Sequence, residues 1–137
     1  MFLGIDIGSS SSKVLALDEA ANILGSAVMN IGTGTNGVEL ALAELERTSN
    51  LRRKDILYTV VTGYGRMTYK DADEQITEIS CHAKGVVACH PEACSIIDIG
   101  GQDAKAIQLS PDGRVENFVM NEKCAAGTGR FFEVMAR

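Results

Sequence analysis

The chain has 137 residues, of which 45% are hydrophobic and 23% are charged, and its formal net charge is -5. The negative balance disfavours a nucleic-acid or anionic-membrane surface, since both select clustered Lys and Arg, and no apolar run approaches the roughly 20 residues of a membrane-spanning helix. The first residues lack a basic segment and Asp6 interrupts the first apolar run, so we expect no signal peptide, a cytoplasmic location and reduced thiols.

Hydrophobic periodicity predicts an α/β order of elements in the first part of the chain. Alternating apolar residues predict three strands, at 2–8, 12–17 and 23–30. A Gly-rich loop at 32–37 leads into a predicted helix at 37–47, whose apolar stripe consists of Val38, Ala41, Leu42 and Leu45. A β-branched strand is predicted at 56–61. A second helix is predicted at 74–88, with an apolar face made of Ile76, Ile79, Ala83, Val86 and Val87.

The pattern of the first three strands then returns. Residues 5–17 align with residues 97–109 at an offset of 92, so that Asp, Gly, Lys and the apolar positions coincide. Three further matches are the turns at 18–22 and 110–114, the triplets Val28-Met29-Asn30 and Val119-Met120-Asn121, and the Gly-rich loops that precede the helices at 37–47 and 129–136. This repetition predicts an internal duplication of a strand–strand–strand–helix unit, not a short-period solenoid.

The duplication divides the chain into a first copy at 1–93 and the start of a second copy at 94–137. The later strand and helix of the second copy are missing, so we expect an N-terminal fragment or truncated form of a longer two-domain protein. A three-stranded half-domain with one helix exposes apolar surface on its open face. We expect the chain to pair with, swap with or pack against another copy through this face.

The loop after the first strand has the features of a phosphate site. Alternation places Asp6 on the face opposite Ile5 and Ile7, and a carboxylate in an apolar strand is costly to bury unless it is paired. Hydrated Mg²⁺ is one such partner. Gly8 allows a tight turn, and the N–H groups and hydroxyls of the following residues can face phosphate oxygens, with Lys13 adding charge nearby. The residues of this predicted loop are Gly8, Ser9, Ser10, Ser11, Ser12 and Lys13.

The loop at 100–103 repeats this chemistry in the second copy. Asp98 stands where Asp6 stands in the first copy, and Gly100-Gly101 permits close approach of the backbone to phosphate. Gln102 and Asp103 add an amide and a carboxylate that can orient a water molecule or a metal ion. Two such hairpins, facing each other across a cleft, would clamp the polyphosphate of one nucleotide.

Two other nucleotide-binding patterns are disfavoured. Gly32-Thr33-Gly34-Thr35-Asn36-Gly37 fits G-x-G-x-x-G, but it follows a third strand instead of the first. In a dinucleotide-binding fold an acid ends the next strand, whereas here Asp55 precedes that strand. We therefore interpret it as a loop and helix start. The Walker A pattern is absent because Val38 follows Gly37.

The two loops resemble those of the actin, Hsp70 and sugar-kinase superfamily, an α/β, ribonuclease H-like fold whose members bind ATP between duplicated domains. A more specific resemblance is to the activator components of 2-hydroxyacyl-CoA dehydratases, in the BadF/BadG/BcrA/BcrD ATPase family. It runs along the whole chain and is carried by four motifs: Gly4-Ile5-Asp6-Ile7-Gly8-Ser9, Thr62-Gly63-Tyr64-Gly65-Arg66, Ile97-Asp98-Ile99-Gly100-Gly101-Gln102-Asp103 and the segment at 121–131. The glycines around Tyr64 make either a structural turn or one that aims a side chain at the cleft or a partner.

The resemblance implies a homodimeric ATPase from anaerobes that binds ATP or ADP with Mg²⁺. One [4Fe–4S] cluster bridges its two protomers, and ATP hydrolysis drives single-electron transfer from a ferredoxin or flavodoxin into a 2-hydroxyacyl-CoA dehydratase. The resemblance makes three residues the candidate catalytic residues: Asp6, Asp98 and Gln102. Both aspartates would bind Mg²⁺ through water molecules, and Gln102 would contact the water that hydrolyses ATP. The phosphate loops are Gly8–Lys13 and Gly100–Asp103.

Cys124 matches the first cluster ligand of this family. A cluster held by four thiolates needs more than one Cys, and a two-fold axis doubles the number of Cys ligands that each protomer supplies. A Cys at a helix N-terminus also has its thiolate form favoured by the helix dipole. The second ligand and the adenine-binding segment are expected beyond Arg137, and Cys81, Cys89 and Cys94 are not obvious substitutes. We therefore expect these 137 residues alone to hold no intact cluster, to bind ATP weakly or not at all, and to be inactive.

Three other functions remain open at this point. A small-molecule kinase of the same superfamily would have no reason to place Cys124 at a helix start that faces a dimer partner. A nucleotide-dependent assembly protein, like actin, would be free of iron. An ATPase component of the benzoyl-CoA reductase type shares the loops and is not distinguished by them.

Overall fold

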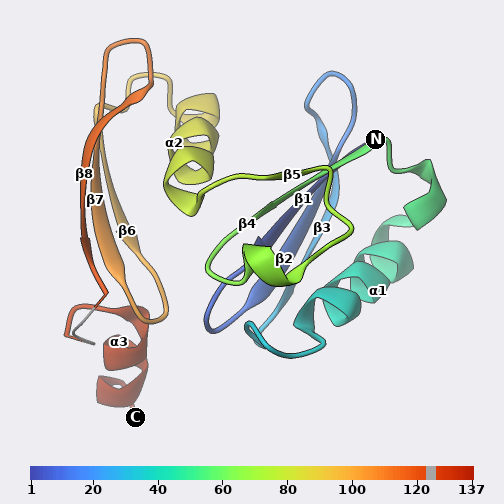
Figure 1. Ribbon diagram of the computed structural model, residues 1–137, viewed down its shortest axis with the longest axis horizontal. Coiled ribbons are helices and arrows are strands. Elements are labelled where there is room, and N and C mark those ends of the chain that lie inside the picture. The colour runs from blue at the N-terminus through green and yellow to red at the C-terminus, as the bar shows by residue number, and fades with distance from the viewer. Residues whose placement is uncertain (123–125) are drawn as a thin grey trace. The chain divides into compact units, whose positions relative to one another are not determined.

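The computed structural model describes residues 1–122 and 126–137, and it divides between Thr77 and Glu78 into two units (Figure 1). The first unit holds a sheet in the order β3-β2-β1-β4-β5. β1, β2 and β3 pair antiparallel, whereas β4 and β5 add parallel pairs. Its elements are β1 (Phe2–Ile7), β2 (Ser12–Leu17), β3 (Ile23–Met29), α1 (Gly37–Ser49), the short 3₁₀ helix η1 (Arg53–Asp55), β4 (Tyr58–Thr62), a second 3₁₀ helix η2 (Arg66–Thr68) and β5 (Glu74–Gln75).

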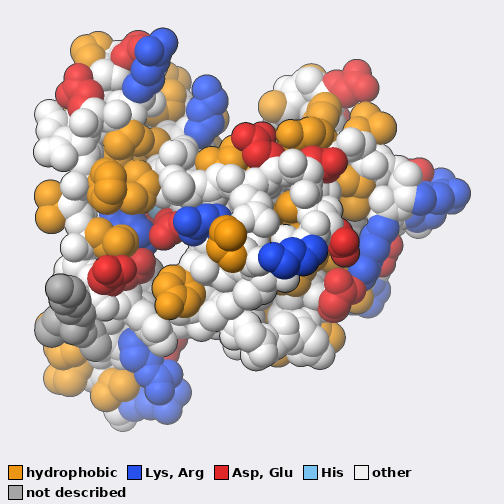
Figure 2. Space-filling view, viewed as in Figure 1, with side chains coloured by type: hydrophobic (Ala, Val, Ile, Leu, Met, Phe, Trp, Pro, Cys, Tyr) orange, Lys and Arg blue, Asp and Glu red, His pale blue; other side chains and the backbone are white. Residues whose placement is uncertain are grey.

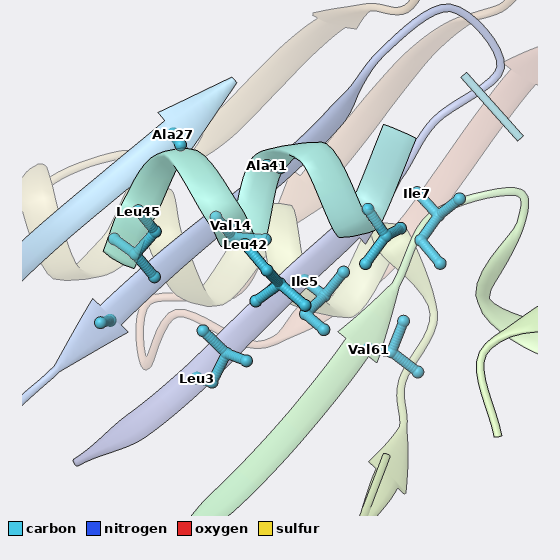
Figure 3. Packing of buried hydrophobic residues seen from close by; sticks show 11 residues of the cluster. Leu3, Ile5, Ile7, Val14, Ala27, Ala41, Leu42, Leu45 and Val61 are labelled. Atoms are coloured by element: carbon cyan, nitrogen blue, oxygen red, sulfur yellow. The ribbon is translucent and has the colours of Figure 1, made fainter. Parts of the chain in front are cut away.

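One face of this sheet is buried beneath α1 (Figure 3). Side chains alternate along a strand, so Leu3, Ile5 and Ile7 are buried while Asp6 lies on the other face. The predicted apolar stripe of α1 is confirmed, because Val38, Ala41, Leu42 and Leu45 are all buried. Burying one such Leu or Ile side chain contributes roughly 1.5–3 kcal/mol to the free energy of folding, so this layer stabilises β1, the strand that carries Asp6.

The second unit has a smaller, all-antiparallel sheet in the order β6-β7-β8. Ala83 of α2 is buried with Ile107 and Leu109 of β7, and Ile79 and Val87 extend this small core. The elements of this unit are α2 (Glu78–Cys89), β6 (Ser95–Ile99), β7 (Ala104–Leu109), β8 (Val115–Asn121) and α3 (Gly129–Met135).

The backbone repeats at the same offset of 92 as the sequence. Asp6 lies opposite Lys13 across β1 and β2, and Asp98 lies opposite Lys105 across β6 and β7. The strand irregularity between Ala16 and Leu17 recurs at 108/109. The turns at 18–22 and 110–114 close with equivalent backbone hydrogen bonds of 3.0 and 2.8 Å. Ala21 and Gly113 occupy the same left-handed position in these turns, with φ of 63° and 76°. The two hairpins therefore share turn geometry as well as residue types.

The third strand corrects one of the sequence matches. Ser12 pairs with Met29, and the equivalent Ala104 pairs with Asn121, so the offset of 92 also holds in β3 and β8. The match of Val28-Met29-Asn30 with Val119-Met120-Asn121 is therefore wrong by one residue. Such a slip would turn every side chain to the other face of the sheet, which pairing with β7 prevents.

Two predicted boundaries also change. The helix predicted at 74–88 begins at Glu78, because Glu74 and Gln75 form β5 along the edge of β4. The backbone N–H of Ile76 donates to the carbonyl of Val61 at 3.0 Å, which holds Ile76 outside the helix. The strand predicted at 56–61 begins at Tyr58, since the N–H of Ile56 still closes the 3₁₀ turn of η1.

The open face of the second sheet is apolar and exposed. At an offset of 92, Ile97 corresponds to Ile5, yet Ile97 is 79% exposed where Ile5 is 1% exposed. Ile99 and Val119 are exposed on the same face, and a hollow of about 370 Å³ is lined by residues of β6, β7 and β8. Groups of hydrophobic side chains at the surface are visible in Figure 2. Within the described residues, no counterpart of the α1 layer covers this face.

Candidate functional site

The first predicted phosphate loop is a tight turn between β1 and β2. The N–H of Gly8 donates to the carbonyl of Ser11 at 2.9 Å, and a Cβ on Gly8 would lie only 3.0 Å from that oxygen. Beside the turn, Lys13 Nζ lies 2.7 Å from Asp6 Oδ2. Both side chains remain partly exposed, so this pair is accessible to a ligand. Ser9 and Ser11 are half-buried and Ser10 is exposed.

Ser12 differs from the other serines of this loop. Its side chain is fully buried, and its hydroxyl donates to the carbonyl of Ile31 at 2.8 Å. A Cβ on Gly37 would lie 2.6 Å from that hydroxyl oxygen, so the start of α1 closes over it. The prediction that every hydroxyl of the loop faces phosphate is therefore wrong for Ser12, whose side chain ties β2 to the segment before α1.

The loop after β4 lies against Asp6. Thr62 sits opposite Asp6 in the parallel β1–β4 pair. Gly63 has φ of 87°, and any Cβ there would collide with Asp6 Oδ1. The N–H of Gly65 donates to the carbonyl of Ile7 at 2.8 Å. The glycines of the Thr62–Arg66 motif thus let the backbone approach the carboxylate, whereas Tyr64 between them is exposed.

Thr62 begins the Thr62–Arg66 motif, but the sequence analysis assigned its hydroxyl no role. Its Oγ1 is buried and has no hydrogen-bond partner within the residues that the structure describes. A buried hydroxyl without a partner costs free energy, and such groups occur next to sites that bind water or an ion. The motif pointed to this position, but nothing in the sequence indicated that the hydroxyl would be buried.

The second predicted loop has the same turn with a more buried lysine. The N–H of Gly100 donates to the carbonyl of Asp103 at 2.9 Å. Lys105 Nζ lies 2.6 Å from Asp103 Oδ2 and 3.2 Å from Asp98 Oδ2, and the Lys105 side chain is only 3% exposed. A Cβ on Gly100 would collide with the Asp103 carboxylate. A larger residue at this position would therefore displace the Asp103 carboxylate from Lys105.

Burial alone lowers the pKa of Lys105, but its hydrogen bonds and charge interactions with Asp103 and Asp98 outweigh that effect and raise the pKa above its ordinary value of 10.5. The ammonium group is thus held charged between two carboxylates.

Two further elements approach this loop. His82 of α2 places Nδ1 3.1 Å from Asp98 Oδ2, a contact that the sequence did not predict. At the start of α3, the N–H groups of Gly129 and Arg130 donate to the carbonyls of Gly100 and Gly101 at 2.8 and 3.0 Å. Gln102, the candidate for orienting water, is exposed at the tip of the loop.

The carboxylates of both loops suit one kind of metal ion. Asp6 and Asp98 offer carboxylate oxygens at partly exposed positions, and these are donors that suit hydrated Mg²⁺. No group of three or more His, Cys, Asp or Glu side chains that could hold an ion directly occurs among residues 1–122 and 126–137. Cys124 lies outside the described residues, and Cys81, Cys89 and Cys94 are free thiols.

None of the described helices is long and apolar enough to cross a membrane.

Known proteins resemble this chain along nearly its whole length. The activator of lactoyl-CoA dehydratase from Anaerotignum propionicum is 56% identical over 135 residues, which cover 98% of this chain and 52% of that protein. A solved activator of the 2-hydroxyisocaproyl-CoA dehydratase from Clostridium difficile, with bound ADPNP, matches with a TM-score of 0.95 at 54% identity, covering 98% of this chain and 50% of that one. The chain therefore spans about half the length of the relatives it matches.

Two further comparisons bear on the alternatives. Component A of the (R)-2-hydroxyglutaryl-CoA dehydratase from Acidaminococcus fermentans matches with a TM-score of 0.91 at 43% identity, covering 98% of this chain and 52% of that one. One of the subunits of benzoyl-CoA reductase from Thauera aromatica is 33% identical over 99 residues, covering 72% of this chain and 35% of that protein.

More distant structures show the fold alone. A structure described as a 2-dehydro-3-deoxygalactonokinase from Sinorhizobium meliloti has a TM-score of 0.57 at 17% identity, covering all of this chain and 57% of that one. The predicted α/β fold of the actin and sugar-kinase type is thereby confirmed. Residues 3–137 match the family described as BadF/BadG/BcrA/BcrD ATPases, and the chain belongs to that family.

Proposed function

We propose that the whole protein is an ATP-dependent activator that delivers single electrons to a 2-hydroxyacyl-CoA dehydratase. The observation that carries this proposal is the repeated hairpin, in which an Asp–Lys pair stands beside a tight glycine turn in both copies. Identity of 56% to an activator of lactoyl-CoA dehydratase supports the dehydratase as partner. The ADPNP bound to a relative at 54% identity supports a nucleotide as ligand.

In this proposal the two loops bind the polyphosphate of ATP. Backbone N–H groups and hydroxyls of Ser9–Ser11 face phosphate oxygens, and Lys13 can leave Asp6 to meet a phosphate because its side chain is 46% exposed. Asp6 and Asp98 bind the water shell of Mg²⁺. Gln102 orients the hydrolytic water. Lys105 has a different role, because its buried ammonium is shared between Asp98 and Asp103 and balances their charge.

Cys124 is proposed as a ligand of a cluster shared by two copies of the protein. Its segment precedes α3, whose first N–H groups bind the carbonyls of Gly100 and Gly101. A change in the nucleotide loop can therefore reach the cysteine segment through a short stretch of chain. A bound [4Fe–4S] cluster would supply the one-electron donor, reduced by a ferredoxin or flavodoxin.

The organisation of the whole protein is part of the proposal. We place the first domain copy at 1–93 and the start of the second at 94–137, because the repeat begins again there. The unit boundary at Thr77/Glu78 reflects packing of α2 on β7 and not the repeat. We also propose a cytoplasmic location, since the described cysteines are free thiols.

The test uses the whole protein purified without oxygen. Wild type should carry about four irons and four sulfides per dimer and hydrolyse ATP. Cys124→Ser should lose the iron. The matched control is Cys89→Ser, because Cys89 is an exposed cysteine on α2 and its replacement should leave the iron unchanged. Asp98→Asn should retain the iron but lose ATP hydrolysis.

Other results would favour the alternatives. If wild type and Cys124→Ser both lack iron while ATP is still hydrolysed, a kinase or a nucleotide-dependent assembly protein is the better description. Phosphorylation of a sugar or acyl acid would then identify a kinase. Nucleotide-dependent filaments that sediment on centrifugation would identify an assembly protein. Activation of a benzoyl-CoA reductase instead of a 2-hydroxyacyl-CoA dehydratase would favour the reductase component, which the lower identity of 33% disfavours.

A further inference from the structure

His82 contacts the carboxylate of the second loop from outside the repeated hairpin. It stands on α2, about one turn after the start of that helix at Glu78, and its Nδ1 lies 3.1 Å from Asp98 Oδ2. The imidazole is mostly covered, with 33% of its side chain exposed. A proton on Nδ1 can donate to the carboxylate whether the ring is neutral or charged.

Asp98 needs this second contact to have one orientation. Its Oδ2 also lies 3.2 Å from Lys105 Nζ, but that ammonium is closer to Asp103, at 2.6 Å, and is shared between the two carboxylates. The terminal torsion of an Asp side chain is broad, so a single shared donor leaves the carboxylate free to rotate. Contacts from two different elements, Lys105 on β7 and His82 on α2, restrict that rotation.

The first copy has a different arrangement. Asp6 is paired with Lys13 on the neighbouring strand, and the Lys13 side chain is 46% exposed. The contact of His82 comes from α2, which lies outside the strand–strand–strand unit that is repeated. The two loops, alike in sequence, thus hold their carboxylates by different means: an exposed lysine in the first copy, and a buried lysine with a histidine in the second.

We propose that His82 is a positioning residue for Asp98 and holds that carboxylate in the orientation that binds nucleotide-associated Mg²⁺ through water. This inference rests on the metal role proposed above for Asp98. Partners that orient the groups around a metal ion typically change metal affinity or activity by 10–100-fold when they are lost. The effect of His82 therefore falls on binding of the metal–nucleotide complex, not on binding of the nucleotide alone.

The test measures ADP affinity of the whole protein by calorimetry, with Mg²⁺ and with a chelator. His82→Ala is expected to weaken binding of Mg-ADP about tenfold and to leave metal-free ADP binding unchanged. His82→Asn is expected to restore most of the affinity, because the Asn amide donates from nearly the position of Nδ1. The control is His90→Ala, since His90 follows the last residue of α2, is exposed, and has its Nδ1 3.8 Å from Glu92 Oε1.

Asp98→Asn separates the two levels of the proposal. If Asp98→Asn weakens Mg-ADP binding but His82→Ala does not, the positioning role of His82 is wrong while the metal role of Asp98 stands. If Asp98→Asn leaves Mg-ADP binding unchanged, the metal role is wrong, and the role of His82 with it. Equal weakening with and without Mg²⁺ in His82→Ala, together with a lower melting temperature, would show a merely structural histidine. In the double variant, His82→Ala should cause no loss beyond that of Asp98→Asn.

Discussion

Lys105 and Lys13 occupy equivalent positions in the two copies, so one substitution at both sites tests how burial sets the strength of an ion pair. We replace each with Met, which keeps most of the apolar stem and removes the charge. Removing one partner of a fully buried pair costs about 3–5 kcal/mol. The carboxylates beside Lys105 are still 22% and 28% exposed, so water can solvate them, and we expect a loss nearer about 2 kcal/mol. Lys13→Met should cost less than about 1 kcal/mol.

Hydrogen exchange of the backbone amides in β7 and β2 reads each site separately, which matters because two units need not unfold together. A loss of about 2 kcal/mol lowers protection in β7 roughly 30-fold. The pKa of folded Lys105 is raised above 10.5, so its contribution is fully present below that pH and is lost as the pH rises through the folded-state pKa. The difference between wild type and Lys105→Met should therefore shrink at strongly alkaline pH. Equal costs for the two variants at neutral pH would refute the argument from burial.

Two further matched pairs test the backbone and the open face. Gly63→Ala should lower the melting temperature, because φ is 87° and a Cβ would meet the Asp6 carboxylate. Gly85→Ala inside α2, where a Cβ meets nothing within 4 Å, should instead stabilise the protein by about 0.5–1 kcal/mol. A lower melting temperature for Gly85→Ala would contradict this reasoning. Ile5→Lys should unfold the first unit, while Ile97→Lys should change stability by less than about 0.5 kcal/mol, as measured by urea unfolding of the 137-residue chain. If Ile97→Lys instead splits a dimer seen by analytical ultracentrifugation, the open face is where two copies meet.

Local patterns were sufficient for much of the fold. Period-2 alternation located β1, β2 and β3, and a period near 3.6 identified the buried stripe of α1, because each pattern depends on neighbours in sequence. The boundary of α2 was misplaced because pairing of β5 with β4, which are separated in sequence, overrides the helical spacing of Ile76. Cys124, the candidate cluster ligand, lies outside the described residues, and its role remains a prediction.

The sequence by itself determined that the chain is duplicated, that each copy carries an Asp–Gly–Lys hairpin, and that the fold is of the actin and sugar-kinase type. These features repeat in the residues, so they can be read without coordinates. Only the tertiary structure decided that Ser12 faces the core, that Lys105 is buried where Lys13 is exposed, and that His82 reaches Asp98. The physical reason is that burial and hydrogen-bond partners depend on which elements pack together, and equivalent motifs acquire different surroundings when different helices pack beside them.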